Sequence, residues 1–236
     1  MHRVFISDLH LERADDNRAL RFAELLDVEG ERCDELYILG DLVEMWIGDD
    51  DDSALAQWLA GCLLACNAAV YLMHGNRDFL FASEFSKASN TTLLPDPYQT
   101  ADGLYLSHGD ALCTDDHDYQ KLRTMLRSSA WQSDILSKSL QERKAFGEGL
   151  RAQSRQANAN KATNIMDVNE EALLEAMQES ACACIVHGHT HRPGKHQHPG
   201  FTRFVTGAWE RCGWLLRQQD QSFQLECFSL ARRYGT

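Results

Sequence analysis

Three features are missing from this 236-residue sequence: an excess of positive charge, a closely paired cysteine motif, and an uninterrupted apolar run of membrane-spanning length. The formal net charge is −12, which argues against non-specific binding to nucleic acid. The eight cysteines include no Cys-x-x-Cys pair, so neither a zinc ribbon nor a thioredoxin-like redox motif is indicated. A chain of this length can form one large α/β domain or two small ones.

The longest mostly apolar stretch covers residues 54–73, but Gln57 and Asn67 interrupt it and four consecutive aspartates precede it. These polar residues favour a core helix followed by a strand at residues 69–73 over a membrane span. A core strand expected already at residues 4–6 leaves no signal peptide before it. We therefore expect a cytoplasmic protein with reduced cysteines.

Short apolar runs that predict strands alternate with helical patterns over most of the chain. This alternation indicates an α/β layered fold, which we expect to form a single domain over residues 1–236. The carboxyl-terminal part lacks helical spacing, so its three strands are expected to form an antiparallel meander. The first expected helix covers residues 18–28. The expected strands cover residues 4–7, 36–39, 69–73, 104–107, 184–186, 201–206, 213–217 and 223–228.

Polar side chains able to bind metal ions follow five of these strands, at the point where each strand ends. Carboxylate, imidazole and carboxamide groups delivered by five strand ends suggest one site, assembled at one edge of a sheet. The five motifs are Asp8-Leu9-His10, Gly40-Asp41, Gly75-Asn76-Arg77-Asp78, His108-Gly109-Asp110 and Gly188-His189-Thr190-His191.

The residue types in these motifs favour metal chemistry. Asp8 and His10 are two residues apart, as are His189 and His191, so on an extended backbone each pair points to one side. Asp41 has two carboxylate oxygens and can bridge two metal ions. This oxygen and nitrogen set suits manganese, iron or zinc better than magnesium or calcium, and the lack of thiolates argues against structural zinc. Two ions about 3.5–4 Å apart can activate water and orient a phosphate, which predicts a two-metal hydrolase of phosphate esters or anhydrides.

Arg77 directly follows Asn76 and can make paired hydrogen bonds to a phosphoryl group. Each motif alone also has a structural interpretation, as a turn, a helix cap or a strand-end histidine, and only the ordered set favours a site. In the acidic cluster of Asp110, Asp115 and Asp116, one residue is a candidate for binding a substrate hydroxyl, and the others are expected to orient His108 or to be solvated. The remaining histidines are expected to be structural or exposed: His2, His74, His117, His187, His196 and His198.

Residues 119–161 differ from the rest of the chain in charge. They contain nine lysines or arginines and only three acidic residues, a local charge of +6. Helix-forming residues dominate, and the segment lies between two ligand motifs, so we expect an insertion over the site. One interpretation is a solvated helical hairpin. The other is a basic helical lid that faces an anionic substrate or membrane surface.

Taken in order, the five motifs resemble those of the calcineurin-like metallophosphoesterase superfamily, and the resemblance spans nearly the whole chain. It implies a two-sheet sandwich flanked by helices, with two divalent metal ions at the strand ends. In that arrangement one ion would be held by Asp8, His10, Asp41 and His191, and the other by Asp41, Asn76, His108 and His189.

Longer matches resemble the UDP-2,3-diacylglucosamine diphosphatase family of lipid A biosynthesis. Arg77 stands where many superfamily members have histidine. The family cleaves the pyrophosphate of its lipid-linked sugar nucleotide at the α-phosphorus, releasing UMP and 2,3-diacylglucosamine 1-phosphate (lipid X). The resemblance implies Mn²⁺ and a peripheral location at the cytoplasmic face of the inner membrane. The similar segments cover residues 39–44, 46–50, 108–116, 154–161 and 165–169.

The same resemblance implies a catalytic role for Arg77 and a lid role for residues 119–161, which would cover acyl chains and phosphate. Residues 127–134 depart from the family's pattern because they are less apolar, which leaves the preferred acyl length open. The implied substrate contacts are Asn76, Arg77, Asp116, Ser154, Asn158, Lys161 and His189.

Two alternatives remain at this stage. A metallophosphoesterase of soluble nucleotides, such as dinucleoside polyphosphates or cyclic nucleotides, would use the same metal ligands. Arg77 and the basic segment argue against it. A non-catalytic scaffold that only binds metal and partners would not need the complete ligand set. The sequence leaves the oligomeric state open.

Overall fold

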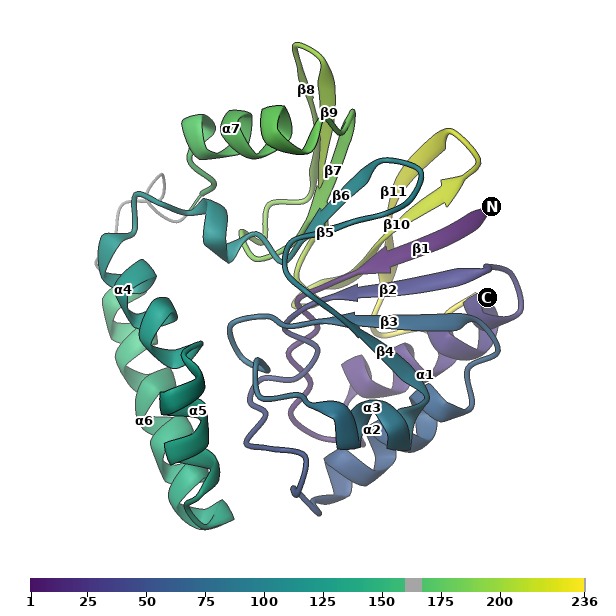
Figure 1. The fold of residues 1–236 in the computed structure, drawn as a ribbon. Coiled ribbons are helices and arrows are strands. Elements are labelled where there is room, and N and C mark those ends of the chain that lie inside the picture. The colour runs from purple at the N-terminus through teal and green to yellow at the C-terminus, as the bar shows by residue number, and fades with distance from the viewer. Residues whose placement is uncertain (160–166, 236) are drawn as a thin grey trace.

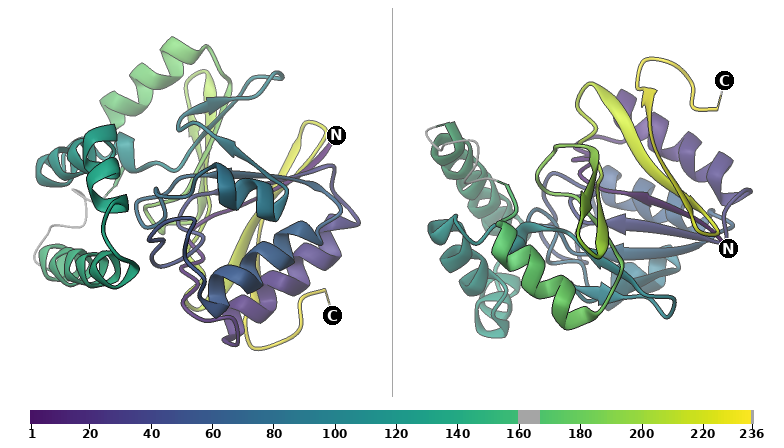
Figure 2. Two further views of the ribbon diagram at one scale, coloured as in Figure 1. Left: turned by 60° about the horizontal axis from the view of Figure 1, so that its bottom comes forward. Right: turned by 90° about the horizontal axis from the view of Figure 1, so that it is seen from above.

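The computed structural model describes residues 1–159 and 167–235 and consists of two β-sheets packed face to face, with helices outside them (Figures 1 and 2). The six strands of the larger sheet are β1 (His2–Ile6), β2 (Glu35–Leu39), β3 (Ala69–Met73), β4 (Thr91–Leu94), β10 (Cys212–Gln219) and β11 (Ser222–Ser229), in the spatial order β11-β10-β1-β2-β3-β4. The five of the smaller sheet are β5 (Tyr98–Gln99), β6 (Leu104–Ser107), β7 (Cys184–His187), β8 (Gly194–His198) and β9 (Phe201–Val205), in the order β5-β6-β7-β9-β8.

Helices cover the outer faces of both sheets, so the predicted α/β sandwich is confirmed. Helices α1, α2 and α3 lie against the larger sheet, and α7 lies against the smaller one (Figure 1). Helices α4, α5 and α6 stand together beside the sheets (Figure 1). The bounds are α1 (Asn17–Gly30), α2 (Ala54–Leu64), α3 (Ser83–Ser89), α4 (His117–Leu126), α5 (Ser129–Leu136), α6 (Leu140–Ala159) and α7 (Glu170–Ser180), with a short 3₁₀ turn, η1 (Asp110–Leu112).

The central strands are apolar on both faces because both faces are covered. In β1, Val4 and Ile6 pack into the core beneath the helices, whereas Phe5 packs into the core between the sheets. Neighbouring β2 repeats the pattern, with Ile38 on the helical side and Leu39 between the sheets. Such continuous apolar runs are typical of buried parallel strands. The pairing of these strands places the carboxyl ends of β1, β2 and β3 next to one another.

The predicted carboxyl-terminal meander is wrong. Strand β9 pairs in parallel with β7 in the smaller sheet, whereas β10 pairs with β1 and β11 in the larger sheet. The three consecutive strands therefore belong to two sheets. Residues 54–73 form α2 and β3, as expected, and no helix among the described residues is long and apolar enough to cross a membrane.

The basic segment forms α4, α5 and α6, three helices rather than a hairpin. Four of its arginines contact carboxylates or backbone carbonyls of the sheet domain, so much of its positive charge attaches it to the rest of the molecule. These contacts are Arg123 to Asp110 (2.8 Å), Arg127 to the Gly75 carbonyl (2.8 Å), Arg143 to Asp50 (2.7 Å) and Arg151 to Glu44 (2.8 Å).

Candidate metal centre

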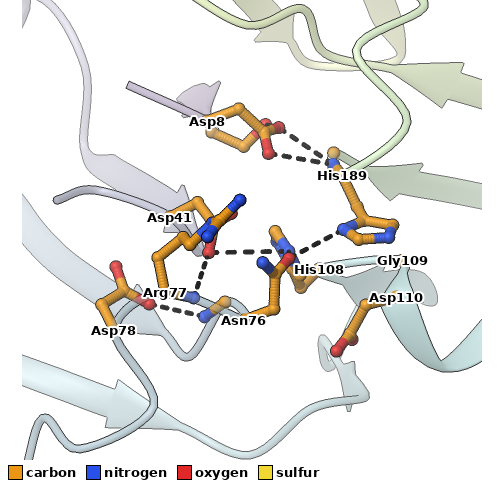
Figure 3. Close-up of polar contacts among 12 residues, drawn as sticks. Asp8, Asp41, Asn76, Arg77, Asp78, His108, Gly109, Asp110 and His189 are labelled. Atoms are coloured by element: carbon orange, nitrogen blue, oxygen red, sulfur yellow. Dashed lines mark hydrogen bonds and ion pairs between the residues drawn. The ribbon is translucent and has the colours of Figure 1, made fainter. Parts of the chain in front are cut away.

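The five ligand motifs meet where the carboxyl ends of β1, β2 and β3 approach those of β6 and β7 (Figures 1 and 3). The predicted meeting of strand ends is confirmed, but it lies between two sheets rather than at one sheet edge. The expected extended backbone at the paired ligands is also wrong. The ligands lie in turns beyond the strands, with positive φ at Asp8 (55°), His10 (50°), Asp41 (52°), His189 (65°) and His191 (55°). Left-handed backbone is uncommon outside glycine, although Asp and His adopt it more readily than most residues, and it concentrates at functional sites.

Close packing of neighbouring loops holds these turns. A Cβ atom on Gly75 would lie 2.1 Å from Oδ1 of Asp41, so only glycine fits there. The buried carboxylate of Asp78 accepts hydrogen bonds from the backbone N–H groups of Gly75 and Leu42, both at 2.7 Å. It thereby ties the loop after β3 to the loop after β2, and Figure 3 shows Asp78 beside Asn76 and Arg77.

We expect Asp78→Ala to lower the free energy of unfolding by about 2–4 kcal/mol, because it leaves two buried N–H donors without acceptors. Asp78→Asn retains one acceptor oxygen and should lose less. Urea denaturation followed by circular dichroism measures both, with the exposed Asp15→Ala as control. A loss at position 78 no larger than that of the control would show that the two hydrogen bonds contribute little.

The first group of ligand atoms comprises Asp8, His10 and His191, whose donor atoms lie within 4.8 Å of one another. Nε2 of His10 lies 3.3 Å from Nε2 of His191, which is itself 3.4 Å from Oδ1 of Asp8. Oδ2 of Asp41 is 3.8 Å from Nε2 of His10. Ligands bound about 2.0–2.2 Å from one ion stand roughly 3–3.5 Å apart, so this group fits a divalent metal.

The second group surrounds the amide of Asn76. Its Oδ1 is 3.0 Å from Nε2 of His108 and 2.9 Å from Nδ1 of His189. Oδ1 of Asp41 is 3.8 Å from Nε2 of His108, so the two oxygens of Asp41 face different groups and can bridge two ions. With the amide rotated by half a turn, its NH₂ would donate to both rings. With Oδ1 of Asn76 facing the two rings, lone pairs of Oδ1, Nε2 of His108 and Nδ1 of His189 point toward one another. A bound cation requires this orientation of the amide.

Hydrogen bonds orient the ring of His108 and the loop that carries His189. Nδ1 of the buried His108 lies 2.8 Å from the Leu39 carbonyl and donates to it, which leaves the Nε2 lone pair facing the site. The backbone N–H of His189 donates to Asp8 at 2.9 Å, so the loops of the two sheets support each other (Figure 3).

The site attracts positive charge. Burial disfavours a charged His108, yet the carboxylates of Asp41 and Asp110 raise the pKa of its ring to about 9. Burial, assisted by the neighbouring His108, lowers the pKa of His189 to about 4, so this ring is a neutral ligand. A divalent cation held by the same carboxylates would displace the proton of His108 and leave both rings neutral.

A cavity of about 300 Å³ opens over the two ligand groups and extends to α4 and α6. Arg77 lines it beside Asn76, and its backbone N–H donates to Asp41 at 2.8 Å. Asp116 and Ser154 also line it, as the expected substrate contacts require. The predicted contacts of Asn158 and Lys161 lie outside the side chains that the structure describes. His187 is buried, and burial lowers the pKa of its ring to about 4, consistent with a structural role.

Two residues near the candidate ligands were not predicted from the sequence, Tyr119 and Glu44. The Tyr119 ring stacks on His189, with centroids 5.9 Å apart, and lines the cavity. Asp110 of the acidic cluster is buried and accepts hydrogen bonds from Tyr119 and Arg123 of α4. It therefore attaches α4 to the loop that follows His108. Glu44 contacts His10. Glu44 follows the candidate ligand Asp41 by three residues, and this proximity in the sequence could have suggested its role.

Comparison with known proteins identifies the family of this chain. The family model described as calcineurin-like phosphoesterase matches residues 1–193. A UDP-2,3-diacylglucosamine hydrolase of Chromobacterium violaceum is 46% identical over 222 residues, covering 90% of this chain and 93% of the relative. Proteins with the same name from Cellvibrio japonicus and Escherichia coli O157:H7 are each 40% identical, over 92% and 95% of this chain and 94% and 98% of theirs.

A solved archaeal phosphodiesterase is similar in fold, with a TM-score of 0.55 at 10% identity, over 97% of this chain and 100% of that one. At this identity the likeness supports the fold alone. The family match over residues 1–193 includes all five ligand motifs, and the relatives at 40% identity cover almost the whole chain. The chain therefore belongs to the calcineurin-like phosphoesterases and, within them, to the family of the UDP-2,3-diacylglucosamine hydrolases.

Proposed function

We propose that this protein hydrolyses the pyrophosphate bond of UDP-2,3-diacylglucosamine, giving UMP and 2,3-diacylglucosamine 1-phosphate for lipid A biosynthesis. The observation that carries the proposal is the cavity that joins two metal-ligand groups, an arginine and an apolar recess between helices. The names of the relatives supply the substrate.

The ligand groups account for the chemistry. Asp8, His10, Asp41 and His191 would hold one divalent ion, and Asp41, Asn76, His108 and His189 the other. When bound, such a pair supplies a nucleophilic water and neutralises charge at phosphorus. We propose Mn²⁺, because mixed oxygen and imidazole ligands suit it. In the hydrolysis, the water oxygen bonds to the α-phosphorus while the bond from that phosphorus to the bridging oxygen breaks.

Arg77 is placed to bind the phosphoryl groups. It follows the Asn76 ligand, and its backbone N–H is fixed by Asp41. Its side chain lines both the metal-facing cavity and the apolar recess. A guanidinium at this junction can make paired hydrogen bonds to phosphoryl oxygens and stabilise the charge that develops as the bond breaks. This is the catalytic role proposed for Arg77.

The apolar recess is the proposed site for an acyl chain. It shares Asn76, Arg77 and Leu150 with the larger cavity, so it begins at the phosphate end. Its volume of about 60 Å³ is that of roughly two water molecules. Its apolar lining includes Met45, Trp46, Ile47, Phe79, Leu80, Trp131, Ile135, Phe146 and Leu150.

The insertion is also the proposed membrane contact, at the cytoplasmic face of the inner membrane. It exposes three large apolar side chains: Met125 is 48% accessible, Leu136 41% and Phe146 40%. Apolar side chains on a segment rich in lysine and arginine are suited to an anionic lipid surface. A lid at that surface would take a lipid-linked substrate directly from the bilayer.

Turnover of two substrate classes tests the proposal. We expect the Mn²⁺-loaded protein to release UMP from UDP-2,3-diacylglucosamine, and chelation of the metal to stop the release. Hydrolysis of dinucleoside polyphosphates and cyclic nucleotides should be at least about 10²-fold less efficient, because they leave the apolar lining unused. Chromatography of the products measures both. A preference for the soluble nucleotides would support the alternative phosphoesterase, and no turnover of either would support a scaffold.

A further inference from the structure

A line of charged contacts connects helix α6 to the first metal-ligand group. Nε of Arg151, on α6, lies 2.8 Å from Oε1 of Glu44. The other oxygen of Glu44, Oε2, lies 2.9 Å from Nδ1 of His10. Nε2, on the far side of the same imidazole ring, faces His191 and Asp41. The Glu44 carboxylate thus contacts both the Arg151 guanidinium and the His10 ring.

Backbone pairing fixes Glu44 relative to His10. The N–H of Glu44 donates to the Leu11 carbonyl at 3.0 Å, and the N–H of Leu11 donates to the Leu42 carbonyl at 3.0 Å. Leu11 and Val43 form an isolated parallel bridge. The segment carrying Glu44 and the segment carrying His10 are therefore held side by side, and the carboxylate reaches the ring without depending on a mobile loop.

The side chains in this line are shielded from solvent. Glu44 is 15% accessible, Arg151 21% and His10 12%. Charge pairs sheltered in this way are screened less by salt than exposed pairs. A carboxylate beside the distal nitrogen of a metal-binding imidazole orients the ring and increases its basicity, and loss of such a partner typically weakens metal binding by about 10–100-fold.

The same helix connects this line to the cavity. Leu150, Gln153 and Ser154 of α6 line the metal-facing cavity next to Arg151. The position of α6 therefore affects both the space for substrate and the orientation of Glu44. A second attachment of α6, from Arg143 to Asp50 at 2.7 Å and to the Ile47 carbonyl at 2.7 Å, holds the helix without touching a ligand residue.

We infer that Glu44 is a positioning residue that links Arg151 of the insertion to the His10 ligand, so that closure of α6 completes the first metal site. The insertion thereby contributes to metal binding in addition to covering the substrate. This inference rests on the two-metal site of the proposed function.

Mn²⁺ affinity of the metal-free protein tests the link without using activity. We expect Glu44→Gln to raise the Kd of the weaker-binding Mn²⁺ by about 10-fold or more and Arg151→Met by about 3–10-fold, measured by isothermal titration calorimetry. The double variant should match Glu44→Gln alone, because Arg151 acts through Glu44. Arg151→Lys, which keeps the charge, should recover part of the affinity. Electron paramagnetic resonance of bound Mn²⁺ reports the change in ligand environment.

Matched controls come from the second attachment of the same helix. Arg143→Met and Asp50→Asn remove one ion pair of the same helix but keep the contacts of Arg151, Glu44 and His10, so their Mn²⁺ affinity should stay within about 2-fold of the unsubstituted protein. Equal losses in these controls would overturn the inference, as would an unchanged affinity in Arg151→Met or additive losses in the double variant. Failure of the unsubstituted protein to bind two Mn²⁺ would instead contradict the proposed metal site.

Discussion

Asp41→Ala should abolish hydrolysis, lowering kcat by on the order of 10⁴-fold or more while the protein stays folded, because both proposed metal sites lose a ligand at once. One carboxylate oxygen lies 3.8 Å from His10 and the other 3.8 Å from His108, so the substitution removes the one group whose oxygens face both ligand groups. Release of UMP from UDP-2,3-diacylglucosamine, followed by chromatography, measures the loss.

Metal stoichiometry separates this effect from misfolding. Asp41 also accepts the Arg77 N–H at 2.8 Å, so the substitution removes one hydrogen bond from the loop. Circular dichroism should remain unchanged, while bound Mn²⁺ falls below two ions per chain. His108→Ala should behave similarly, and the exposed Asp15→Ala should be fully active. Full activity of Asp41→Ala after metal removal would contradict the two-metal mechanism.

The residue types and order of the candidate ligands could be predicted from the sequence, but their backbone could not. Polar residues directly after apolar strands are visible as a local pattern. The left-handed turns at Asp8 and His10 depend on contacts with other segments, such as the hydrogen bond from the N–H of Asp8 to the Gly40 carbonyl at 3.1 Å. The alternation rule assumes extended backbone, yet it placed Asp8 and His10 side by side, as they are in the structure. Their proximity comes instead from left-handed turns.

The prediction that the last three strands belong to one sheet was wrong for a similar reason. Strand β9 has the same apolar character as β10, and nothing local shows that one joins β7 and the other β1. Edge strand β8 has the polar sequence Gly-Lys-His-Gln-His, so its hydrophobic pattern gives no strand signal. Long-range pairing decided both cases. The role of Glu44 was obscured likewise, because its partner His10 lies on another segment of the chain.

The attachment of the insertion changes how its charge is interpreted. A local excess of basic residues suggested a surface that faces an anion, yet Arg123, Arg127, Arg143 and Arg151 contact carboxylates or carbonyls of the sheet domain. Arg77 belongs to the sheet domain and lines the cavity beside the ligand Asn76. The proposed catalytic arginine is therefore distinct from the four arginines that attach the insertion, and substitutions can separate the two roles.

Arg77→Ala should lower kcat by about 10²–10³-fold, the effect of removing one group that stabilises developing charge in a transition state. Arg77→Lys should recover little of this loss, because an ammonium group cannot make the planar pair of hydrogen bonds to a phosphoryl group. Steady-state kinetics with UDP-2,3-diacylglucosamine measures kcat and KM separately. The exposed Arg13→Ala, which loses only its pair with Asp15, is the matched control.

The Mn²⁺ affinity of the Arg77 variants distinguishes a catalytic role from a structural one. Only the backbone N–H of Arg77 contacts Asp41, and substitution of the side chain preserves that N–H. Two Mn²⁺ ions should therefore still bind with unchanged affinity, in contrast to Asp41→Ala. A higher KM with unchanged kcat would assign Arg77 to ground-state binding of substrate. Loss of Mn²⁺ together with activity would instead make it a support of the metal centre.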